Sequence, residues 1–503
     1  MAGKHTLASV IILLYAVVGA LVYTNYGISW DEEYQHSYGK VVYEYVFDGN
    51  QELHEHNSRY HGPAFQFILY SAEILGELTD TKEVFEMRHF LTFLVSVLGL
   101  LFFYRLLLQL KFSSFWASTG MLFLMLSPRI FAHSFYNSKD AVFMHLFIVS
   151  IYTMVKFLRK PNLRTALWHA VTCGFLIDVR ILGAFVPVFT TIIWGLNSAS
   201  DKSYAQSSIR SFIVFGCATG FFMIAFWPTL WHNPLVEFQA ALAKMSAYPW
   251  DDEILFDGTF LIPQEMPWYY LPKWMIISSP IFVTVLSVIG IVSWSADSQL
   301  RKTTRLVPFL WVVIPLGMIL WTNATVYDGW RHVFFLYPPI IIVATHGSRF
   351  VFQTVLTHRY ATFIPLGFLL FPAFWMAKNH PHQNVYFNSL TANDAWKKYE
   401  MDYWGLSYKQ AYEYLVQHQP EGELHVSVAN TPGFYNHWTL SAKDQERIEF
   451  VDRTEASYFL SNLRFPQEHN GFQQQLPPYS QPLYVIEIDE NPIMGIFKVE
   501  AKP

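Results

Sequence analysis

The chain has 503 residues, of which 52% are hydrophobic and 15% are charged. A soluble domain carries about 25% charged residues, so this composition argues against an ordinary soluble protein and favours a membrane protein. The formal net charge of -5 gives no basis for nucleic-acid binding, and two cysteines, Cys173 and Cys217, cannot build a disulfide framework or a thiolate metal site.

Apolar runs predict eleven membrane helices, because each run approaches the roughly 20 residues that cross a bilayer. The first run has no small-residue cleavage site, so we expect a retained helix and not a signal peptide. A break at Asp178-Val179-Arg180 divides one long run into a helical hairpin, with Asp178 and Arg180 as a buried pair. The predicted helices lie near residues 7–24, 88–107, 115–127, 140–158, 165–178, 181–197, 209–228, 274–294, 306–322, 330–346 and 360–377.

Basic residues indicate the orientation of these helices. Cytoplasmic segments of membrane proteins carry an excess of Lys and Arg. With the N-terminus in the cytoplasm, the short inner segments collect most of the basic residues, and the C-terminal tail lies on the outer side. The inner basic residues would be Lys4, Arg105, Lys111, Lys156, Arg159, Lys160, Arg164, Lys202, Arg210, Arg301, Lys302, Arg305, Arg349 and Arg359.

The first outer loop, residues 25–87, is long and contains the stretch NYGISWDEEYQHSYGK directly after the first helix. Aromatic and apolar residues follow at helical spacing, and the apolar stretch 64–75 suits a helix that lies in the membrane interface. Asp31 and Glu32 open the first of these helices. They could simply stabilise the positive helix end, or they could act as a general base or metal ligand near the membrane surface.

The second outer loop, residues 229–272, is rich in Trp, Tyr and Pro, and loops of this length are usually functional. Its acidic run, Asp251 to Glu253, more often represents a solvated face than a cation site. The histidines His54, His56 and His61 in the first loop are a weak metal signal. We find no P-loop, no nucleotide-binding Gly-rich motif and no Ser–His–Asp pattern.

The sequence changes character near residue 378, beyond which no run could span a membrane. Short alternating stretches predict strands, and 407–417 predicts a helix. We therefore expect two units, a membrane domain over residues 1–377 and a small α/β domain over 378–503 on the extracytoplasmic side. The predicted strands are 423–428, 447–451, 483–488 and 493–499.

These features together resemble the GT-C fold glycosyltransferases. Within that class the chain is most similar to the family 39 group of protein O-mannosyltransferases and aminoarabinose transferases. The resemblance covers about the first 380 residues and rests on the acidic pair after the first helix, the long first loop and the topology. Stretches similar to those of bacterial relatives are YNSKDAVFMHLF (136–147), MPWYYLPKW (266–274), GWRHVFFLYPP (329–339), NVYFNSL (384–390) and DYWGLSYKQA (402–411).

The resemblance implies a sugar donor joined to a polyprenyl phosphate and a single inverting displacement. Such a reaction needs one base for the acceptor hydroxyl and cations for the phosphate leaving group. The resemblance makes Asp31 the base and Glu32 the second choice, and the position of Asp140 at a helix start makes it a second acid that orients the acceptor or binds a cation. The expected phosphate ligands are Lys139, Arg331, His332, Arg59 and His61.

Each phosphate ligand also has a simpler interpretation. Lys139 and Asp140 could be a pair at a helix start, Arg331 could extend towards the interface, and Arg59 and His61 could be solvated. The sugar, the acceptor (lipid, glycan or protein) and a need for a divalent cation stay open. The main alternative function is a transporter or lipid flippase, and a third is a non-catalytic assembly protein. We expect an integral protein of a bacterial inner membrane that binds membrane lipid and no nucleic acid.

Overall fold

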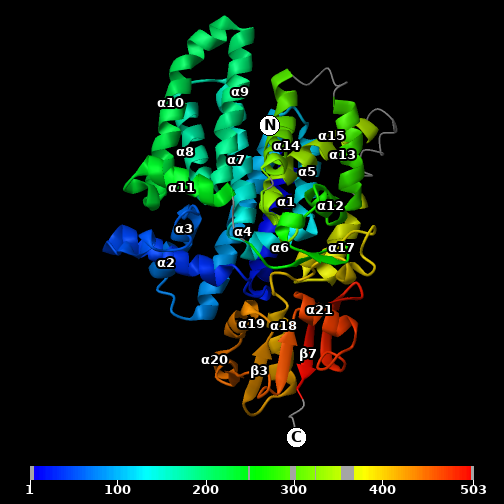
Figure 1. Ribbon diagram of the computed structural model, residues 1–503. Coiled ribbons are helices and arrows are strands. Elements are labelled where there is room, and N and C mark those ends of the chain that lie inside the picture. The colour runs from blue at the N-terminus through cyan, green and yellow to red at the C-terminus, as the bar shows by residue number, and fades with distance from the viewer. Residues whose placement is uncertain (1–4, 247–249, 295–301, 323, 353–366, 500–503) are drawn as a thin grey trace.

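The protein is a bundle of long helices with a small sheet at one end (Figure 1). The structure is a computed structural model that describes residues 5–246, 250–294, 302–322, 324–352 and 367–499. The sheet, from the C-terminal part of the chain, lies at one end of the bundle, and the turn between α9 and α10 lies at the other (Figure 1). This arrangement confirms the predicted class, a helical polytopic protein with a small C-terminal domain.

Every predicted apolar run is mostly helical where the structure describes it, and the run 274–294 is interrupted between Ile277 and Ile281. The beginning of the predicted run 360–377, and the predicted inner residues Lys4, Arg301 and Arg359, lie outside the described residues. The helices of the bundle are α1 (Thr6–Val22), α4 (Thr81–Gln109), α5 (Ser114–Met125), α6 (Pro128–Tyr136), α7 (Asp140–Arg159), α8 (Leu163–Val179), α9 (Phe185–Ser200), α10 (Lys202–Phe226), α12 (Tyr270–Ile277), α13 (Ile281–Trp294), α14 (Lys302–Trp321), α15 (Tyr337–Phe350) and α17 (Leu370–Lys378).

Six helical segments are long and apolar enough to cross a membrane, and two bent helix pairs raise the number to eight within the described residues. The bent pairs are α5–α6, with a bend of 68°, and α12–α13, with a bend of 119°. The six segments therefore fall short of the eleven predicted spans because several predicted spans are bent or short. The segments are Thr6–Asn25, Thr81–Gln109, Asp140–Arg159, Ile181–Ser200, Lys202–Phe226 and Arg331–Phe350.

Both long loops contain ordered structure. The first forms α2 (Glu32–Asp48) and α3 (Ala64–Leu75), where helices were predicted. The second forms α11 (Pro234–Ser246) and a hairpin of β1 (Ile254–Phe256) and β2 (Thr259–Leu261), which was not predicted. The sequence carried a signal for this hairpin, because Asp-Gly between alternating apolar residues favours a two-residue turn. Asp257 and Gly258 both adopt positive φ, 55° and 83°.

The C-terminal domain is a mixed five-stranded sheet with strand order β4-β3-β5-β7-β6. Strand β3 pairs in parallel with β4 and β5, and β7 pairs antiparallel with β5 and β6. Four of the strands were predicted; β5, of four residues, was missed. The elements are α18 (Tyr408–His418), β3 (Leu424–Val428), α19 (Thr431–Asn436), α20 (Ala442–Gln445), β4 (Ile448–Phe450), β5 (Tyr458–Ser461), α21 (Pro466–Gln473), β6 (Pro482–Ile488) and β7 (Asn491–Lys498).

Short 3-10 helices join many of these elements, and two of them border the cavity described below: η4, which leads into α9, and η7, which leads into α15. The described 3-10 helices are η2 (Tyr23–Asn25), η3 (Gln51–His54), η4 (Ile181–Ala184), η5 (Pro228–Trp231), η6 (Pro263–Glu265), η7 (Arg331–Leu336), η10 (Gln383–Val385), η11 (Ala395–Lys397) and η12 (His437–Thr439).

Contacts with the C-terminal domain fix the segment that leads into α2. The Trp30 N–H donates to the carbonyl of Trp404 at 3.1 Å. Asn436 accepts from the Ile28 N–H at 2.9 Å and donates to the Ile28 carbonyl at 2.8 Å. Because these three bonds satisfy buried backbone groups, the chain just before Asp31 has one well-defined path.

Two glycines let α13 and α15 lie against each other. A Cβ atom on Gly290 would lie 2.1 Å from the Val343 carbonyl oxygen, and one on Gly347 would lie 2.1 Å from the Leu286 carbonyl oxygen. Small residues at such positions allow close helix contact within membranes. Since η7 runs into α15, this contact also fixes the position of η7.

We expect Gly347→Val to destabilise the bundle, because the added carbons meet backbone atoms that cannot move aside. Overpacking of this kind costs about 1–3 kcal/mol. Thermal unfolding of the purified protein in detergent would measure the effect. Gly317→Val in α14 is the control, because nothing lies within 4 Å of a Cβ at Gly317. Equal melting temperatures for the two variants would contradict this account of the α13–α15 contact.

Candidate active site

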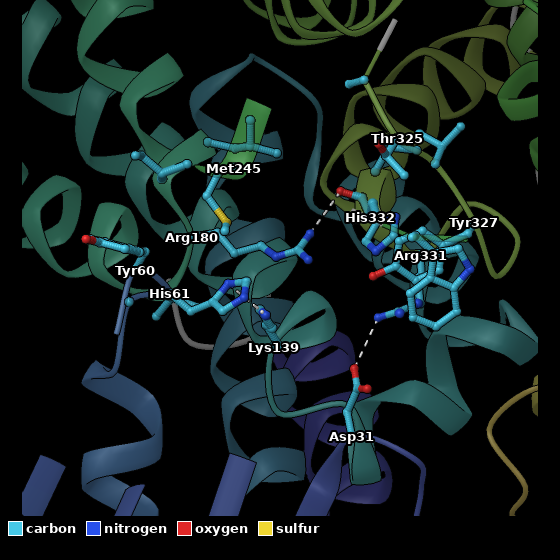
Figure 2. A pocket seen from close by; sticks show the side chains of 18 of the residues that line it. Asp31, Tyr60, His61, Lys139, Arg180, Met245, Thr325, Tyr327, Arg331 and His332 are labelled. Atoms are coloured by element: carbon cyan, nitrogen blue, oxygen red, sulfur yellow. Dashed lines mark hydrogen bonds and ion pairs between the residues drawn. The ribbon is translucent and has the colours of Figure 1, made fainter. Parts of the chain in front are cut away.

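A cavity of about 220 Å³ lies where helix ends from several parts of the chain meet (Figure 2). Its charged and polar wall comes from the start of α2, the loop before α3, the N-terminal end of α7 and η7. Its apolar wall comes from the break between α8 and α9, from α11 and from the end of α14. The polar lining includes Asp31, Tyr34, Gln35, Tyr60, His61, Lys139, Arg180, Arg331 and His332; the apolar lining includes Val179, Ile181, Leu182, Met245, Ile319, Val326 and Val333.

Arg331 is the centre of the charged wall. Its Nη1 lies 3.3 Å from Asp31 Oδ2 and 3.2 Å from Asp140 Oδ2, and its Nη2 lies 3.1 Å from Asp328 Oδ2. The guanidinium also lies over the rings of Tyr327 and Trp404, at 5.0 and 4.8 Å from their centroids. Planar guanidinium groups suit such combined carboxylate pairing and ring stacking.

Asp31 is the carboxylate that faces the cavity. Its side chain is 36% exposed, whereas those of Asp140 and Asp328 are 1% and 6% exposed and do not line the cavity. Asp31 occupies the residue before α2, yet its side chain makes no capping hydrogen bond to the helix. The simple capping interpretation of Asp31 therefore does not describe this carboxylate, which contacts Arg331 and retains open lone pairs toward the cavity.

Glu32, the second candidate base, faces away from the cavity. It is buried, lies 2.9 Å from His89 Nε2 and accepts a hydrogen bond of 2.7 Å from the Ser29 N–H. Consecutive helical residues point about 100° apart, so two adjacent carboxylates cannot share one direction. Glu32 thus stabilises the entry into α2, and the structure does not place this second choice of base on the cavity wall.

Lys139 and His61 form a pair on the cavity wall, where Lys139 Nζ donates to His61 Nδ1 at 3.1 Å. Burial lowers the pKa of Lys139 to about 7, and the charge of Arg180 adds to this effect. Burial also lowers the pKa of His61 well below its usual value, and the nearby charge of Lys139 lowers it further. His61 is therefore a neutral acceptor, and Lys139 changes its charge near neutral pH.

Arg180 belongs to the cavity, although the sequence predicted a pair with Asp178. The guanidinium lies 2.8 Å from Asp140 Oδ1 and donates to the carbonyl of His332 at 3.4 Å. Arg180 has extended backbone angles, φ -151° and ψ 134°, so its side chain does not follow the direction set by α8. The predicted Asp178–Arg180 pair is therefore wrong, and Arg180 adds a cation that sequence reasoning did not assign to the site.

The remaining candidates divide between the cavity and its surroundings. His332 lines the cavity, with its ring against Tyr327 at 4.6 Å between centroids. Arg59 does not line it; its guanidinium donates to the His54 carbonyl and to Tyr60 Oη. The acidic run 251–253 is exposed, as its solvated interpretation predicted.

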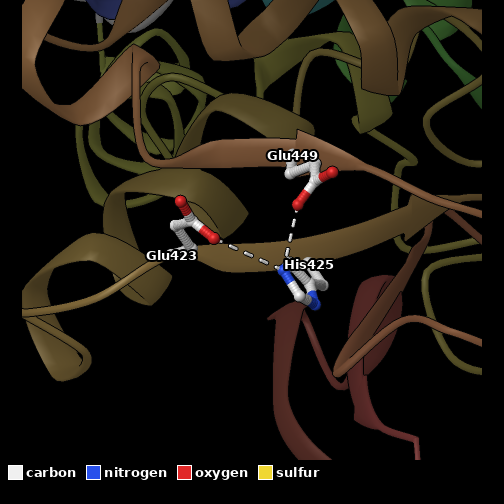
Figure 3. A group of neighbouring side chains, drawn as sticks. All are labelled: Glu423, His425 and Glu449. Carbon is white, nitrogen blue, oxygen red and sulfur yellow. Dashed lines mark ion pairs between the residues drawn. The ribbon is translucent and has the colours of Figure 1, made fainter.

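The carboxylates of the cavity do not offer an open cation site. Of the candidate ligands, Glu32 contacts His89 instead. Asp31 and Asp140 approach the same Nη1 atom of Arg331, so the position between them is occupied by a guanidinium. A divalent cation would have to displace it. Within the described ranges, one group has the spacing of metal ligands: Glu423, His425 and Glu449 (Figure 3). It lies on strands β3 and β4 and just before β3, where His425 Nε2 is 3.0 Å from Glu449 and 3.8 Å from Glu423.

Part of the sequence matches a known family. Residues 60–233 match the family described as "Dolichyl-phosphate-mannose-protein mannosyltransferase". The matched segment includes the cavity residues His61, Lys139 and Arg180. The resemblance predicted from the sequence is therefore confirmed. A comparison with curated proteins found no match.

Solved structures agree with this match. The oligosaccharyltransferase of Archaeoglobus fulgidus in its apo form has a TM-score of 0.51 at 11% identity, over 89% of this chain and 65% of that chain. The same enzyme, AglB, in complex with an inhibitory peptide and a dolichol-phosphate has a TM-score of 0.51 at 11% identity, over 90% and 69%. The chain has the GT-C fold. The chain spans less than two thirds of the length of the apo oligosaccharyltransferase chain.

A third solved structure, the arabinofuranosyltransferase AftD from Mycobacteria, has a TM-score of 0.47 at 12% identity, over 98% of this chain and 40% of that chain. The identities of the two archaeal structures are low, so these structures establish the fold alone and leave the chemistry to the residues of this cavity.

The charge of Lys139 generates a prediction for anion binding. Below pH 7 the amine is mainly protonated and can contact a phosphate; above pH 7 it is mainly neutral. We therefore expect a lipid-linked phosphodiester, whose own charge is constant here, to bind most tightly below pH 7 and about 10- to 100-fold more weakly above pH 8, the value of one charged hydrogen bond. A fluorescent phosphodiester lipid titrated into the protein in nanodiscs would measure this.

The matched variant is Lys139→Arg, which keeps its charge over the same pH range and should flatten the profile. Lys244→Arg is the control, because Lys244 donates to the carbonyl of Asn57 and does not line the cavity. An unchanged pH dependence in Lys139→Arg would show that another group controls binding.

Proposed function

We propose that the protein is an integral membrane glycosyltransferase that moves one hexosyl or pentosyl unit from a polyprenyl-phosphate-linked donor to an acceptor hydroxyl, with inversion. The observation that carries this proposal is the arrangement of the cavity: a partly exposed carboxylate, Asp31, lies opposite an apolar wall and beside Lys139, Arg180 and Arg331. A base, several cations and a surface for a lipid are the groups that this reaction needs.

In the proposed reaction the acceptor oxygen attacks C1 of the sugar while the bond from C1 to the phosphate oxygen breaks. Asp31 takes the acceptor proton, and the electron pair of the broken bond leaves with the polyprenyl phosphate. The additional negative charge develops on the phosphate, so Lys139 and Arg180 contribute most where the charge increases. Asp140 touches neither partner; it holds the guanidinium groups of Arg331 and Arg180 in place.

The size and lining of the cavity support a donor with one sugar. Sites for drug-sized ligands usually measure about 300–1,000 Å³, so a cavity of about 220 Å³ suits a sugar phosphate and not a long glycan. Ile181, Met245 and Ile319 offer an apolar surface to the first units of a polyprenyl chain. The matched family description names a dolichyl phosphate mannose donor, and one similar structure contains a dolichol-phosphate. The acceptor is a lipid, a glycan or a protein.

The placement of the charges favours a transferase over a transporter or lipid flippase. Asp31 precedes α2, Lys139 precedes α7, Arg180 follows α8 and Arg331 begins η7, so the cavity is built from helix ends. Transporters typically bind their substrates near the middle of the membrane, between broken helices. We assign the basic side chains of the cavity to binding the donor phosphate. We do not assign a divalent cation, because the guanidinium of Arg331 occupies the position between Asp31 and Asp140.

The exchange Asp31→Asn tests the proposal. The amide keeps the shape of the side chain but cannot accept the acceptor proton. Loss of one positioned base typically costs about 10² to 10⁴ in rate, so we expect at least a hundredfold loss of sugar transfer with normal expression and donor binding. Mass spectrometry of envelope glycans and glycoproteins, with and without the gene, identifies the product; transfer by the purified protein then gives the rates.

Two further variants serve as references. Asp251→Asn alters an exposed acid outside the cavity and should leave the rate unchanged. Glu32→Gln weakens the contact with His89 and should lower stability more than turnover. If Asp31→Asn transfers sugar at the parent rate, Asp31 is not the base. If no envelope product depends on the gene, the transferase assignment itself fails.

We further propose that the site and the C-terminal domain face the extracytoplasmic side of a bacterial inner membrane. A cysteine at the exposed position Gln474 should then react with an impermeant maleimide in intact spheroplasts. The background should carry Cys217→Ser, because Cys217 is exposed while Cys173 is buried. A cysteine at Ser200, beside the α9–α10 turn, should react after lysis alone. The reverse pattern would invert the orientation.

A further inference from the structure

The charged wall of the cavity continues into the C-terminal domain. Asp328, which binds Arg331 through Oδ2, binds Arg464 through Oδ1, at 2.6 Å from Arg464 Nη2. The side chains of both residues are almost completely buried, 6% exposed for Asp328 and 4% for Arg464. A continuous chain of charges therefore leads from Arg464 through Asp328 and Arg331 to Asp31, the residue that faces the cavity.

Local structure holds Arg464 rigidly. It lies between β5 and α21, and its Nη1 donates to the Tyr403 carbonyl at 2.9 Å. The guanidinium lies 5.0 Å from the ring centroid of Trp30, one residue before Asp31. Its Nε is 3.5 Å from Glu400 Oε1. Arg464 thus contacts the segment that carries Asp31 as well as the partner of Arg331.

The charges of this network balance. Burial raises the pKa of Glu400, so this side chain tends to be protonated and neutral. The guanidinium groups of Arg180, Arg331 and Arg464 then face the carboxylates of Asp31, Asp140 and Asp328, three against three. Asp140 and Asp328 each lie between two guanidinium groups, whereas Asp31 contacts one. Asp31 therefore depends on Arg331 alone, and Arg331 also contacts the other two carboxylates.

We propose that Arg464 is a positioning residue that controls how readily Asp31 takes a proton, by holding Asp328 so that Arg331 stays in contact with Asp31. Without Arg464, Asp328 would keep a full uncompensated charge in a buried place, where electrostatic attraction is strong. It would then attract Arg331 more strongly. The contact of Arg331 with Asp31 would weaken, because cavity water competes there and does not reach the other carboxylates.

Other charged groups near this network act in the same way in all variants. Lys139, Tyr34, His61, Arg180 and His332 line the same cavity as Asp31. Asp140 approaches the same Nη1 atom of Arg331 as Asp31 does. Glu32 adjoins Asp31 in sequence and is paired with His89. These groups are the same in the parent and in every variant, so they do not contribute to the difference in labelling between them.

Around the two arginines, Tyr327 faces Arg331 from the same loop, and Glu400 and Asp252 act on Arg464. None of them replaces the lost charge, so the change on removal of Arg464 has one direction. Asp31 loses positive charge from its surroundings and becomes protonated at higher pH.

The test measures protonation of Asp31 directly. Dicyclohexylcarbodiimide reacts with protonated carboxyl groups, and peptide mass spectrometry gives the labelled fraction of Asp31 at each pH for the full-length protein in nanodiscs. We expect Arg464→Met to shift the midpoint of labelling upward by about one pH unit, the lower end of what one arginine does to a neighbouring carboxylate. Arg464→Lys, which keeps the charge, should shift it less.

The double variant Arg464→Met/Asp328→Asn separates this role from a structural one. It removes one charge of each sign, so the midpoint should return close to that of the parent. If Arg464→Met fails to fold, Asp328→Asn decides alone: it frees Arg331 and should lower the midpoint. An unchanged midpoint in Arg464→Met, or a shift that persists in the double variant, would overturn the proposal.

The effect of Arg464 on Asp31 matters for catalysis only if the proposed function is right, but the labelling measurement does not depend on that function. In a working transferase, the acidic limb of the pH–rate profile should move upward in Arg464→Met by the same amount as the labelling midpoint. If the parent protein transfers no sugar while the labelling shifts, the proposed function fails and the control of Asp31 by Arg464 stands. If the parent transfers sugar while the labelling stays fixed, the inference fails alone.

Discussion

The site depends on the ion pairs that the buried guanidinium of Arg331 makes. The guanidinium joins the carboxylates of Asp31, Asp140 and Asp328, which come from the entry to α2, the start of α7 and the loop before η7. Removing one partner of a buried ion pair typically costs about 3–5 kcal/mol, because it leaves a charge without compensation. The three segments therefore cannot separate independently, and the cavity keeps its shape although its walls are far apart in the sequence.

This pairing also distinguishes groups that are chemically alike. Three aspartates share one arginine, but two of them are closed off by a second arginine and by burial, which leaves Asp31 as the one with open lone pairs. The cations differ in the same manner. Arg331 and Arg464 contact carboxylates, whereas the described hydrogen bond of the Lys139 amine is to the neutral His61. The proposed base and the proposed variable charge of the cavity are thus the two groups whose neighbours leave them least neutralised.

The sequence was sufficient for most of the helices and most of the sheet, and it named Asp31, Lys139 and Arg331, which the structure brings to one cavity. Apolar runs are local information, and they predict where helices lie better than how many of them are long and straight enough to cross a membrane. The direction in which a side chain points is not set by the local sequence alone. Whether Asp31 or Glu32 faces the cavity depends on the rotation of α2, and whether Arg180 pairs with Asp178 or Asp140 depends on where α8 ends. Asp328 and Arg464 were missed because their meaning arises from a contact across 136 positions of sequence.

Arg464 lies 136 positions after Asp328 and is therefore synthesised later. During biosynthesis Asp328 is therefore made, and its helices can insert, long before its second cation exists. Until the last strands fold against the bundle, the charges around Arg331 are out of balance and the cavity is incomplete. A half-made chain thus lacks the second guanidinium that Asp328 contacts in the complete fold.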